Sequence, residues 1–125
     1  PKNMGRAITR FFKDSETFLT SAYENDINPI VQPMTQAVSE LKQATEWLVA
    51  NGMSNPNNAG GASYDYMKMF GLVLLGLAHV RICLATKDAD RHNTARYFMD
   101  RILPETSFLL KRIRCGSDTM MKSEF

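Results

Sequence analysis

The sequence predicts an all-α protein, an up-down-up-down four-helix bundle whose fourth helix is kinked or broken near Pro104. Four segments repeat apolar residues at intervals of three and four, the spacing of one face of an α-helix. No segment shows the apolar–polar alternation of a half-buried strand. The 125 residues, 44% hydrophobic and 22% charged, have the size and composition of one globular domain. We therefore expect one bundle over residues 1–116 and a flexible tail over 117–125.

The first two helices are predicted over residues 4–24 and 30–51. In the first, the apolar positions share one arc of the helix and the basic side chains lie mostly opposite. The stretch between the helices, residues 25–29, is rich in Asn, Asp and Pro, which favour turns. Asn51 and Gly52 end the second helix, because glycine readily takes a positive φ.

The third helix is predicted over residues 64–87, after a flexible surface loop over 53–63 that consists largely of Asn, Gly, Pro, Ser and Ala. This helix is apolar on nearly all sides, which indicates burial on more than one side. Gly71 and Gly76 lie in its interior, where each costs about 1 kcal/mol relative to alanine. We therefore expect a neighbouring helix to approach closely there. Arg81 lies among these apolar residues, and a buried arginine would need a carboxylate partner.

The fourth helix is predicted over residues 90–114, with apolar residues along one side and basic residues mainly along the other. Pro104 lies inside this pattern and has no N–H to donate to the carbonyl of Asp100, so we expect the kink or break there. The basic side includes carboxylates and has no interleaved aromatic residues, which favours a solvated face. Together with a net charge of only +2, this pattern predicts no nucleic-acid partner.

No motif predicts a catalytic, cofactor-binding or metal site. A di-metal carboxylate bundle needs Glu-x-x-His pairs, and the sequence contains none. His79 and Cys83 are four residues apart and would be only half of a four-ligand metal site. Cys83 and Cys115 form no Cys-x-x-Cys pair, which favours reduced thiols and a cytoplasmic location. The longest apolar run, over residues 69–78, is about half as long as a membrane span, so no span is predicted.

Two exceptions to the amphipathic pattern indicate an interaction surface. Trp47 falls on the polar side of the second helix, and the third helix carries a stripe that mixes polar ends with outward leucines. This stripe consists of Lys68, Leu72, Leu75, His79 and Thr86. The alternative is that Trp47 packs under the 53–63 loop and that the third helix is simply the central one.

Two stretches of the sequence resemble a known family. Residues 62–73 read Ala-Ser-Tyr-Asp-Tyr-Met-Lys-Met-Phe-Gly-Leu-Val and continue into Gly76 and Arg81, and residues 94–106 read Thr-Ala-Arg-Tyr-Phe-Met-Asp-Arg-Ile-Leu-Pro-Glu-Thr. Together they resemble the C-terminal domain of a subgroup of flavin-dependent acyl-CoA dehydrogenases. That subgroup includes 3-methylmercaptopropionyl-CoA dehydrogenase and related bacterial fatty acyl-CoA dehydrogenases. Its pattern has a Phe-Gly step in a long apolar helix, then a Thr-Ala-basic-aromatic-aromatic run that ends in Leu-Pro.

This resemblance implies a helical domain appended to a dehydrogenase body that oxidises an acyl-CoA to a 2-enoyl-CoA. In these enzymes FAD and the glutamate that acts as base belong to that body. Gly60-Gly61 lacks the neighbours of the family's flavin-contacting Gly-Gly motif. The resemblance therefore implies that this chain carries no catalytic, cofactor-binding or metal-binding residue. It implies packing on the body, for which Trp47 and the Leu72/Leu75 stripe are the candidate contacts.

The parent enzyme is expected to be a homo-oligomer, with this bundle covering surface that other members use for assembly. A sequence that opens at Pro1 without an initiator methionine fits this expectation. The alternative is a free-standing helical protein-interaction module, which would normally begin at its own methionine. A third alternative is a small phosphotransfer protein that carries phosphate on His79, although the residues after His79 do not match that class.

Overall fold

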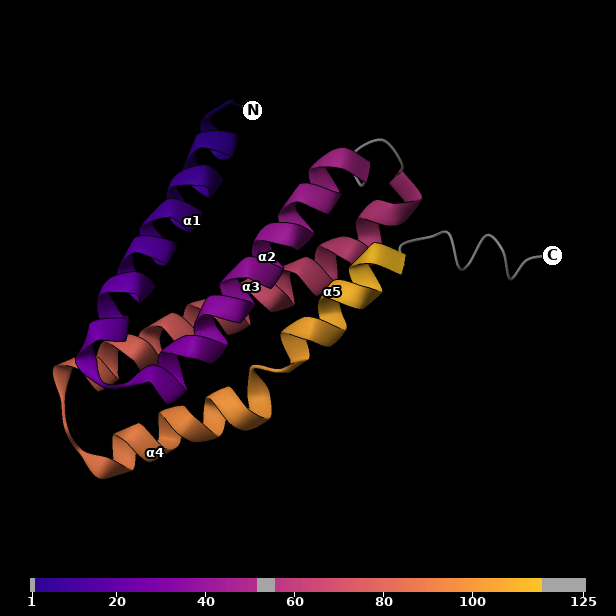
Figure 1. Cartoon of the computed structure of the whole chain (residues 1–125). Coiled ribbons are helices and arrows are strands. Elements are labelled where there is room, and N and C mark those ends of the chain that lie inside the picture. The colour runs from indigo at the N-terminus through magenta and orange to yellow at the C-terminus, as the bar shows by residue number, and fades with distance from the viewer. Residues whose placement is uncertain (1, 52–55, 116–125) are drawn as a thin grey trace.

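The computed structural model describes residues 2–51 and 56–115, with the backbone alone described at residues 2–4 and 56–60. Its helices are α1 (Lys2–Ala22), α2 (Asn28–Asn51), α3 (Pro56–Ala85), α4 (Ala89–Tyr97) and α5 (Glu105–Cys115). A 3-10 turn, η1 (Tyr23–Asn25), follows α1, and a π-helical turn, η3 (Phe98–Ile102), follows α4. The described residues contain no strand. Successive helices run in opposite directions, with α4 and α5 sharing one direction (Figure 1), so the predicted up-down-up-down bundle is confirmed.

The link between α1 and α2 lies where the turn is predicted. α1 ends two residues before its predicted end, and η1 leads to Asp26, whose φ of 61° is in the left-handed region. Aspartate tolerates this region better than most residues do. The carbonyl of Ile27 then accepts hydrogen bonds from the N–H groups of Ile30 and Val31, at 2.9 and 3.0 Å. α2 therefore begins at Asn28, two residues before its predicted start.

The core lies where α2, α3 and α5 meet. Each helix contributes large apolar side chains that are at most 2% exposed, and burial of each contributes about 1.5–3 kcal/mol. From α2 these are Val31, Met34, Val38 and Leu41, from α3 Met69, Val73 and Val80, and from α5 Leu109 and Ile113. The apolar repeat of α2 and α5 thus predicts the side that each helix buries.

α3 begins eight residues before its predicted start, so the prediction of a loop over 53–63 is wrong for residues 56–63. The fixed φ of proline and its missing N–H suit the first turn of a helix, and Pro56 takes that position. α3 ends at Ala85, two residues before its predicted end. Residues 53–55 and the predicted tail over 117–125 lie outside the described residues.

The two interior glycines of α3 have different surroundings. A Cβ on Gly76 would overlap the sulfur of Met34 on α2 and lie 3.3 Å from the Phe98 ring, so the expected close approach is confirmed there. A Cβ on Gly71 would meet nothing within 4 Å, and Gly71 is exposed, so the same expectation is wrong for Gly71. The difference arises because Gly71 lies on the side of α3 that faces away from α2.

The predicted fourth helix, residues 90–114, is interrupted near Pro104, as expected. The N–H of Leu103 donates to the carbonyl of Phe98, five residues back, at 2.9 Å, which is the π-helical pattern. Pro104 has no N–H with which to continue the helix. The N–H of Thr106 then donates to the carbonyl of Leu103 at 2.9 Å, and α5 continues in the same general direction as α4 after a bend (Figure 1).

Candidate docking face on the third helix

One side of α3 is left uncovered by the rest of the described domain along most of the helix. We name this side the outward face of α3. It consists of Tyr64, Met67, Gly71, Leu74, Leu75, Ala78, Arg81, Ile82 and Ala85, all of which are exposed. Apart from Leu75 and Ile82, these residues follow one another at intervals of three and four, so they form one line along the helix. Leu75 and Ile82 form a second line beside it.

The outward face is more apolar than an ordinary solvated surface. Tyr64 and Met67 each expose 69% of their surface, Leu75 exposes 56% and Leu74 exposes 48%. Single exposed apolar residues are common, but a contiguous apolar patch marks contact with another protein or a membrane. The face therefore becomes the candidate functional site.

The hydropathy of α3 is high enough to raise a membrane alternative. Within Gly61–Ala85, an 18-residue stretch has a mean hydropathy of 1.7, and 33% of that stretch is buried. By length and composition this is the one described helix able to cross a membrane, a test that core helices of soluble proteins also pass. The prediction of no membrane span rests on the longest uninterrupted apolar run. The mean hydropathy is taken over a longer stretch, in which a few polar residues are outweighed by the apolar ones.

The edge of the outward face toward α5 is made of ion pairs and an aromatic ring. The Arg112 Nε and Nη2 groups donate to the two carboxylate oxygens of Asp65, at 2.8 and 2.5 Å. The same guanidinium lies 5.0 Å from the ring centre of Phe108, and the hydrogen bond to Asp65 raises the pKa of Arg112 above its ordinary value. One turn further along, the Lys68 ammonium lies 3.0 Å from Glu105. These contacts fix α5 beside the face.

The edge toward α1 is aromatic. The rings of Phe11 and Phe70 stack with their centres 5.0 Å apart. Further along α3, the guanidinium of Arg81 lies 5.2 Å from the ring centre of Phe18. Arg81 is exposed, so the expectation of a buried arginine with a carboxylate partner is wrong. An arginine on an aromatic ring keeps its charge in water and needs no such partner.

The structure separates the five residues predicted as an interface. Leu75 lies on the outward face, and Lys68 lies at its α5 edge. Leu72 is only 9% exposed and belongs to the core, so the prediction that it faces outward is wrong. His79 is half-buried, with its ring 4.8 Å from an aromatic ring of η3, and Trp47 is half-buried against the core.

The predicted stripe is displaced around α3 by roughly one residue from the exposed line, a rotation of about 100°. Because α3 is apolar on several sides, its pattern alone does not show which side is buried. Tyr64, Met67, Leu74 and Ile82 were therefore missed as site residues. Tyr64, Met67 and Leu74 do lie on one line of three-and-four spacing, but the line that the prediction chose has the same spacing, so this signal alone does not separate the two.

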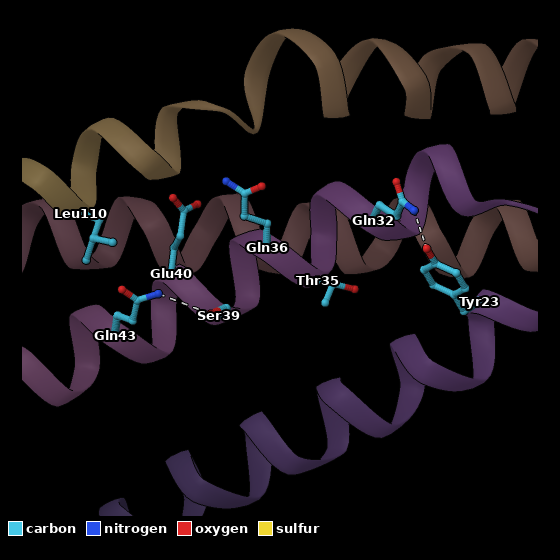
Figure 2. A pocket seen from close by; sticks show the side chains of 8 residues that line it. All are labelled: Tyr23, Gln32, Thr35, Gln36, Ser39, Glu40, Gln43 and Leu110. Carbon is cyan, nitrogen blue, oxygen red and sulfur yellow. Dashed lines mark hydrogen bonds between the residues drawn. The ribbon is translucent and has the colours of Figure 1, made fainter.

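A groove of about 530 Å³ runs along α2 on another part of the surface (Figure 2). Uncharged polar side chains line most of it, and the amide of Gln32 donates to the Tyr23 hydroxyl at one end. At the other end Glu40 is nearly buried, and its carboxylate accepts hydrogen bonds from the hydroxyls of Thr106 at 2.8 Å and Ser107 at 2.5 Å. Glu40 thus holds the start of α5 against α2, which is a structural role.

The reactive side chains of the described residues do not form a reactive cluster. Within residues 2–51 and 56–115, no three or more His, Cys, Asp or Glu side chains gather where they could hold a metal ion. Cys83 is buried, and its burial raises the pKa of the thiol, which keeps it neutral and weakly nucleophilic. The geometry is that of a helical bundle whose most distinctive surface is one uncovered apolar face.

Comparison with known families agrees with this class of domain. A family model described as acetyl-CoA dehydrogenase C-terminal like matches residues 11–124, nearly the whole chain. The chain therefore belongs to the family of acetyl-CoA dehydrogenase C-terminal-like domains, and the resemblance seen in the sequence is confirmed at this level. A comparison with curated proteins found no match.

Proposed function

We propose that the chain is the C-terminal domain of a flavin-dependent acyl-CoA dehydrogenase and that it packs on the catalytic body through the outward face of α3. The observation that carries this proposal is an exposed apolar line along α3 in a domain of this family. The motifs at residues 62–73 and 94–106 favour the subgroup of 3-methylmercaptopropionyl-CoA and bacterial fatty acyl-CoA dehydrogenases. The parent enzyme would convert an acyl-CoA to a 2-enoyl-CoA.

In this proposal the chemistry belongs to the catalytic body. Bound FAD supplies the redox chemistry that amino-acid side chains cannot supply. Gly60-Gly61 lies within α3 rather than in a loop that could approach a cofactor, which supports assigning the flavin to the body. The contribution of this domain is instead to cover apolar surface of the body and to support assembly of a homo-oligomeric, cytoplasmic parent enzyme.

The size of the outward face supports a stable contact rather than a transient one. The line from Tyr64 to Ala85 spans about 32 Å at 1.5 Å per residue. Large apolar side chains at the centre of a contact supply most of its binding energy, and Leu74 and Leu75 lie at the centre of this line. Leaving these side chains in water would favour association of the domain with other surfaces.

Two experiments test the proposal: the sequence of the gene upstream of Pro1, and then cleavage of the full-length protein. We expect this sequence to continue, upstream and in frame, into a dehydrogenase body, and the full-length protein to carry flavin and oxidise acyl-CoA. A protease site placed between body and domain then allows cleavage under native conditions. The proposal requires the cleaved domain to stay with the body and Leu75→Glu to release it. A complete gene that begins at Pro1, or a domain that separates freely when unmutated, would contradict it.

The second candidate function is a free-standing helical interaction module, and the same exposed face favours it. A module of this kind would use the outward face of α3 for a separate protein. The reading frame distinguishes the two candidates, because a free-standing module has no dehydrogenase body encoded upstream in the same frame. In that case membership of the family would reflect shared ancestry only.

A further inference from the structure

We infer that the outward face of α3 receives a single long α-helix of the catalytic body, which presents large apolar side chains and a carboxylate opposite Arg81. This inference rests on the function proposed above and names the chemistry of the partner. Its first support is the spacing of the face. Seven exposed residues alternate at three and four, the seam along which two helices pack side by side. They are Tyr64, Met67, Gly71, Leu74, Ala78, Arg81 and Ala85.

The second support is the distribution of side-chain size along the seam. Gly71, Ala78 and Ala85 are small and lie seven residues apart. Around them stand the large exposed side chains of Met67 and Leu74. A Cβ on Gly71 would meet nothing within 4 Å, so the space beside it is open, and we call the gap that this residue without a side chain leaves between Met67 and Leu74 the hollow. Hollows bordered by large side chains accept the side chains of a facing helix as knobs, and they allow the two helix axes to come close.

The third support is the charge of Arg81, which interrupts the apolar seam. Among the described residues, no carboxylate forms an ion pair with Arg81 within 4.0 Å, and its guanidinium lies only against the Phe18 ring. Lys68, at the other end of the face, already has Glu105 at 3.0 Å. A cation covered by an apolar contact needs a carboxylate in reach. The helix that covers Arg81 must therefore supply one.

A second copy of this chain fits the seam less well. Antiparallel packing of two α3 helices about a two-fold axis would be centred between Leu74 and Leu75. Lys68 and Arg81 are equally distant from that centre, so Arg81 of each copy would face Lys68 of the other. Two cations would then meet, and the carboxylate of Glu105 is already engaged by Lys68. A helix with its own carboxylate avoids this conflict.

Photo-crosslinking in the full-length protein tests the geometry. A benzophenone amino acid replaces Met67, Leu74 or Ile82 in turn, and the linked peptides are identified by mass spectrometry. The inference predicts that all three positions link to one helix of the body and that the linked site moves along it by about seven residues per step. Links that fall in loops, in strands, in scattered segments or in a second copy would overturn it.

Two substitutions test the hollow and the charge, with the cleaved full-length protein as the assay. Gly71→Leu fills the hollow and Arg81→Glu reverses the charge, and each should weaken retention of the domain by about tenfold or more. Gly5→Leu and Arg10→Glu are the controls, because both residues are exposed and lie on α1, away from the outward face. A Cβ on Gly5, like one on Gly71, would meet nothing within 4 Å.

The results separate this inference from the proposed function. If Leu75→Glu releases the domain while Gly71→Leu and Arg81→Glu behave as the controls do, the face docks but its partner is not a helix with a facing carboxylate. If Leu75→Glu has no effect and the unmutated domain separates freely, the proposed function itself is wrong. Binding of the 125-residue chain to anionic vesicles, abolished by Leu75→Glu, would assign the face to a membrane and overturn the inference.

Discussion

Asp65 on α3 and Arg112 on α5 are joined by two parallel hydrogen bonds that close one edge of the outward face, at 2.8 and 2.5 Å. Asp65 is only 6% exposed, whereas the side chain of Arg112 is about half exposed. Removal of the arginine would leave a nearly buried carboxylate without its ion-pair partner, which is far more costly than the loss of an exposed pair. The pair therefore fixes how α5 lies beside the face.

Arg112→Ala is expected to lower the melting temperature of the domain more than Arg114→Ala does. Arg114 also makes one hydrogen bond across the bundle, to Gln43 at 2.8 Å, but both of those residues are exposed. Circular dichroism at 222 nm during heating measures both variants. Equal shifts for the two variants would show that the Asp65–Arg112 pair has no special role.

Glu40→Ala is expected to lower the free energy of unfolding by about 2–3 kcal/mol, because it removes the acceptor of two hydroxyl groups at the start of α5. Thr106 is 1% exposed, so water cannot readily replace the lost partner. Glu40→Gln keeps one acceptor oxygen and should cost less. Urea unfolding measures the effect, with the exposed Glu46→Ala as a control that should stay within about 0.5 kcal/mol of the unmutated domain. Equal losses at residues 40 and 46 would contradict the structural role of Glu40.

The two interior glycines of α3 should respond to alanine with opposite signs. Gly71→Ala is expected to stabilise the domain by about 1 kcal/mol, because the new Cβ meets nothing within 4 Å and alanine favours the helix. Gly76→Ala is expected to destabilise it by about 1 kcal/mol, because the Cβ collides with Met34, which is fully buried. Urea unfolding of both variants and of the unmutated domain measures the two changes in the free energy of unfolding. Shifts of the same sign would mean that α3 does not face its neighbours as described.

The two cysteines should differ in reactivity and in their effect on pH stability. Cys115 is exposed and should react quickly with a thiol reagent, whereas Cys83 is buried and should react only on unfolding. Burial raises the pKa of Cys83 above the ordinary 9.0 that the unfolded chain retains. The stability that its neutral thiol contributes is therefore complete below about pH 9 and declines as the pH rises toward the folded-state pKa.

Urea unfolding at about pH 8 and pH 10 measures this decline, with Cys83→Ala as the comparison. The unmutated domain should lose more stability between the two pH values than the variant, because both share every other titrating group. Identical losses, or two fast-reacting thiols per chain, would contradict the burial of Cys83.

The sequence predicts the order of the helices, and it predicts the buried side of α1, α2 and the fourth segment because these are amphipathic. Pro104 also predicted the break before α5, since a missing N–H has a local effect that needs no knowledge of the fold. The start of α3 was missed because residues 57–61 are mostly Asn and Gly, which have low helix propensity. In the structure these residues are nevertheless helical, as the first turns of the long helix that begins at Pro56. Local residue propensities give no indication that η3 is π-helical.

The candidate site was harder to predict for a physical reason. A helix that is apolar on several sides has no preferred buried side until its neighbours are known. Gly76 faces Met34 and Gly71 faces outward, yet both read alike in the sequence. The Asp65–Arg112 pair, 47 residues apart in the chain, likewise depends on how α3 and α5 are rotated. The sequence therefore places Leu72 at the surface and Arg81 in the interior, because the rotation of α3 about its own axis is not determined by its apolar pattern.

The central claim is the proposal that a catalytic body covers the outward face of α3 in the full-length protein, and the labelling rate of a cysteine introduced at Leu75 tests it most directly. Leu75→Cys is compared in the 125-residue chain and in the full-length protein, with Glu46→Cys as a control, and peptide mass spectrometry reports the rate at each site. The account predicts fast labelling at residue 75 in the short chain, labelling slower by about tenfold or more in the full-length protein, and equal rates at residue 46. Equally fast labelling at residue 75 in both proteins would contradict the claim.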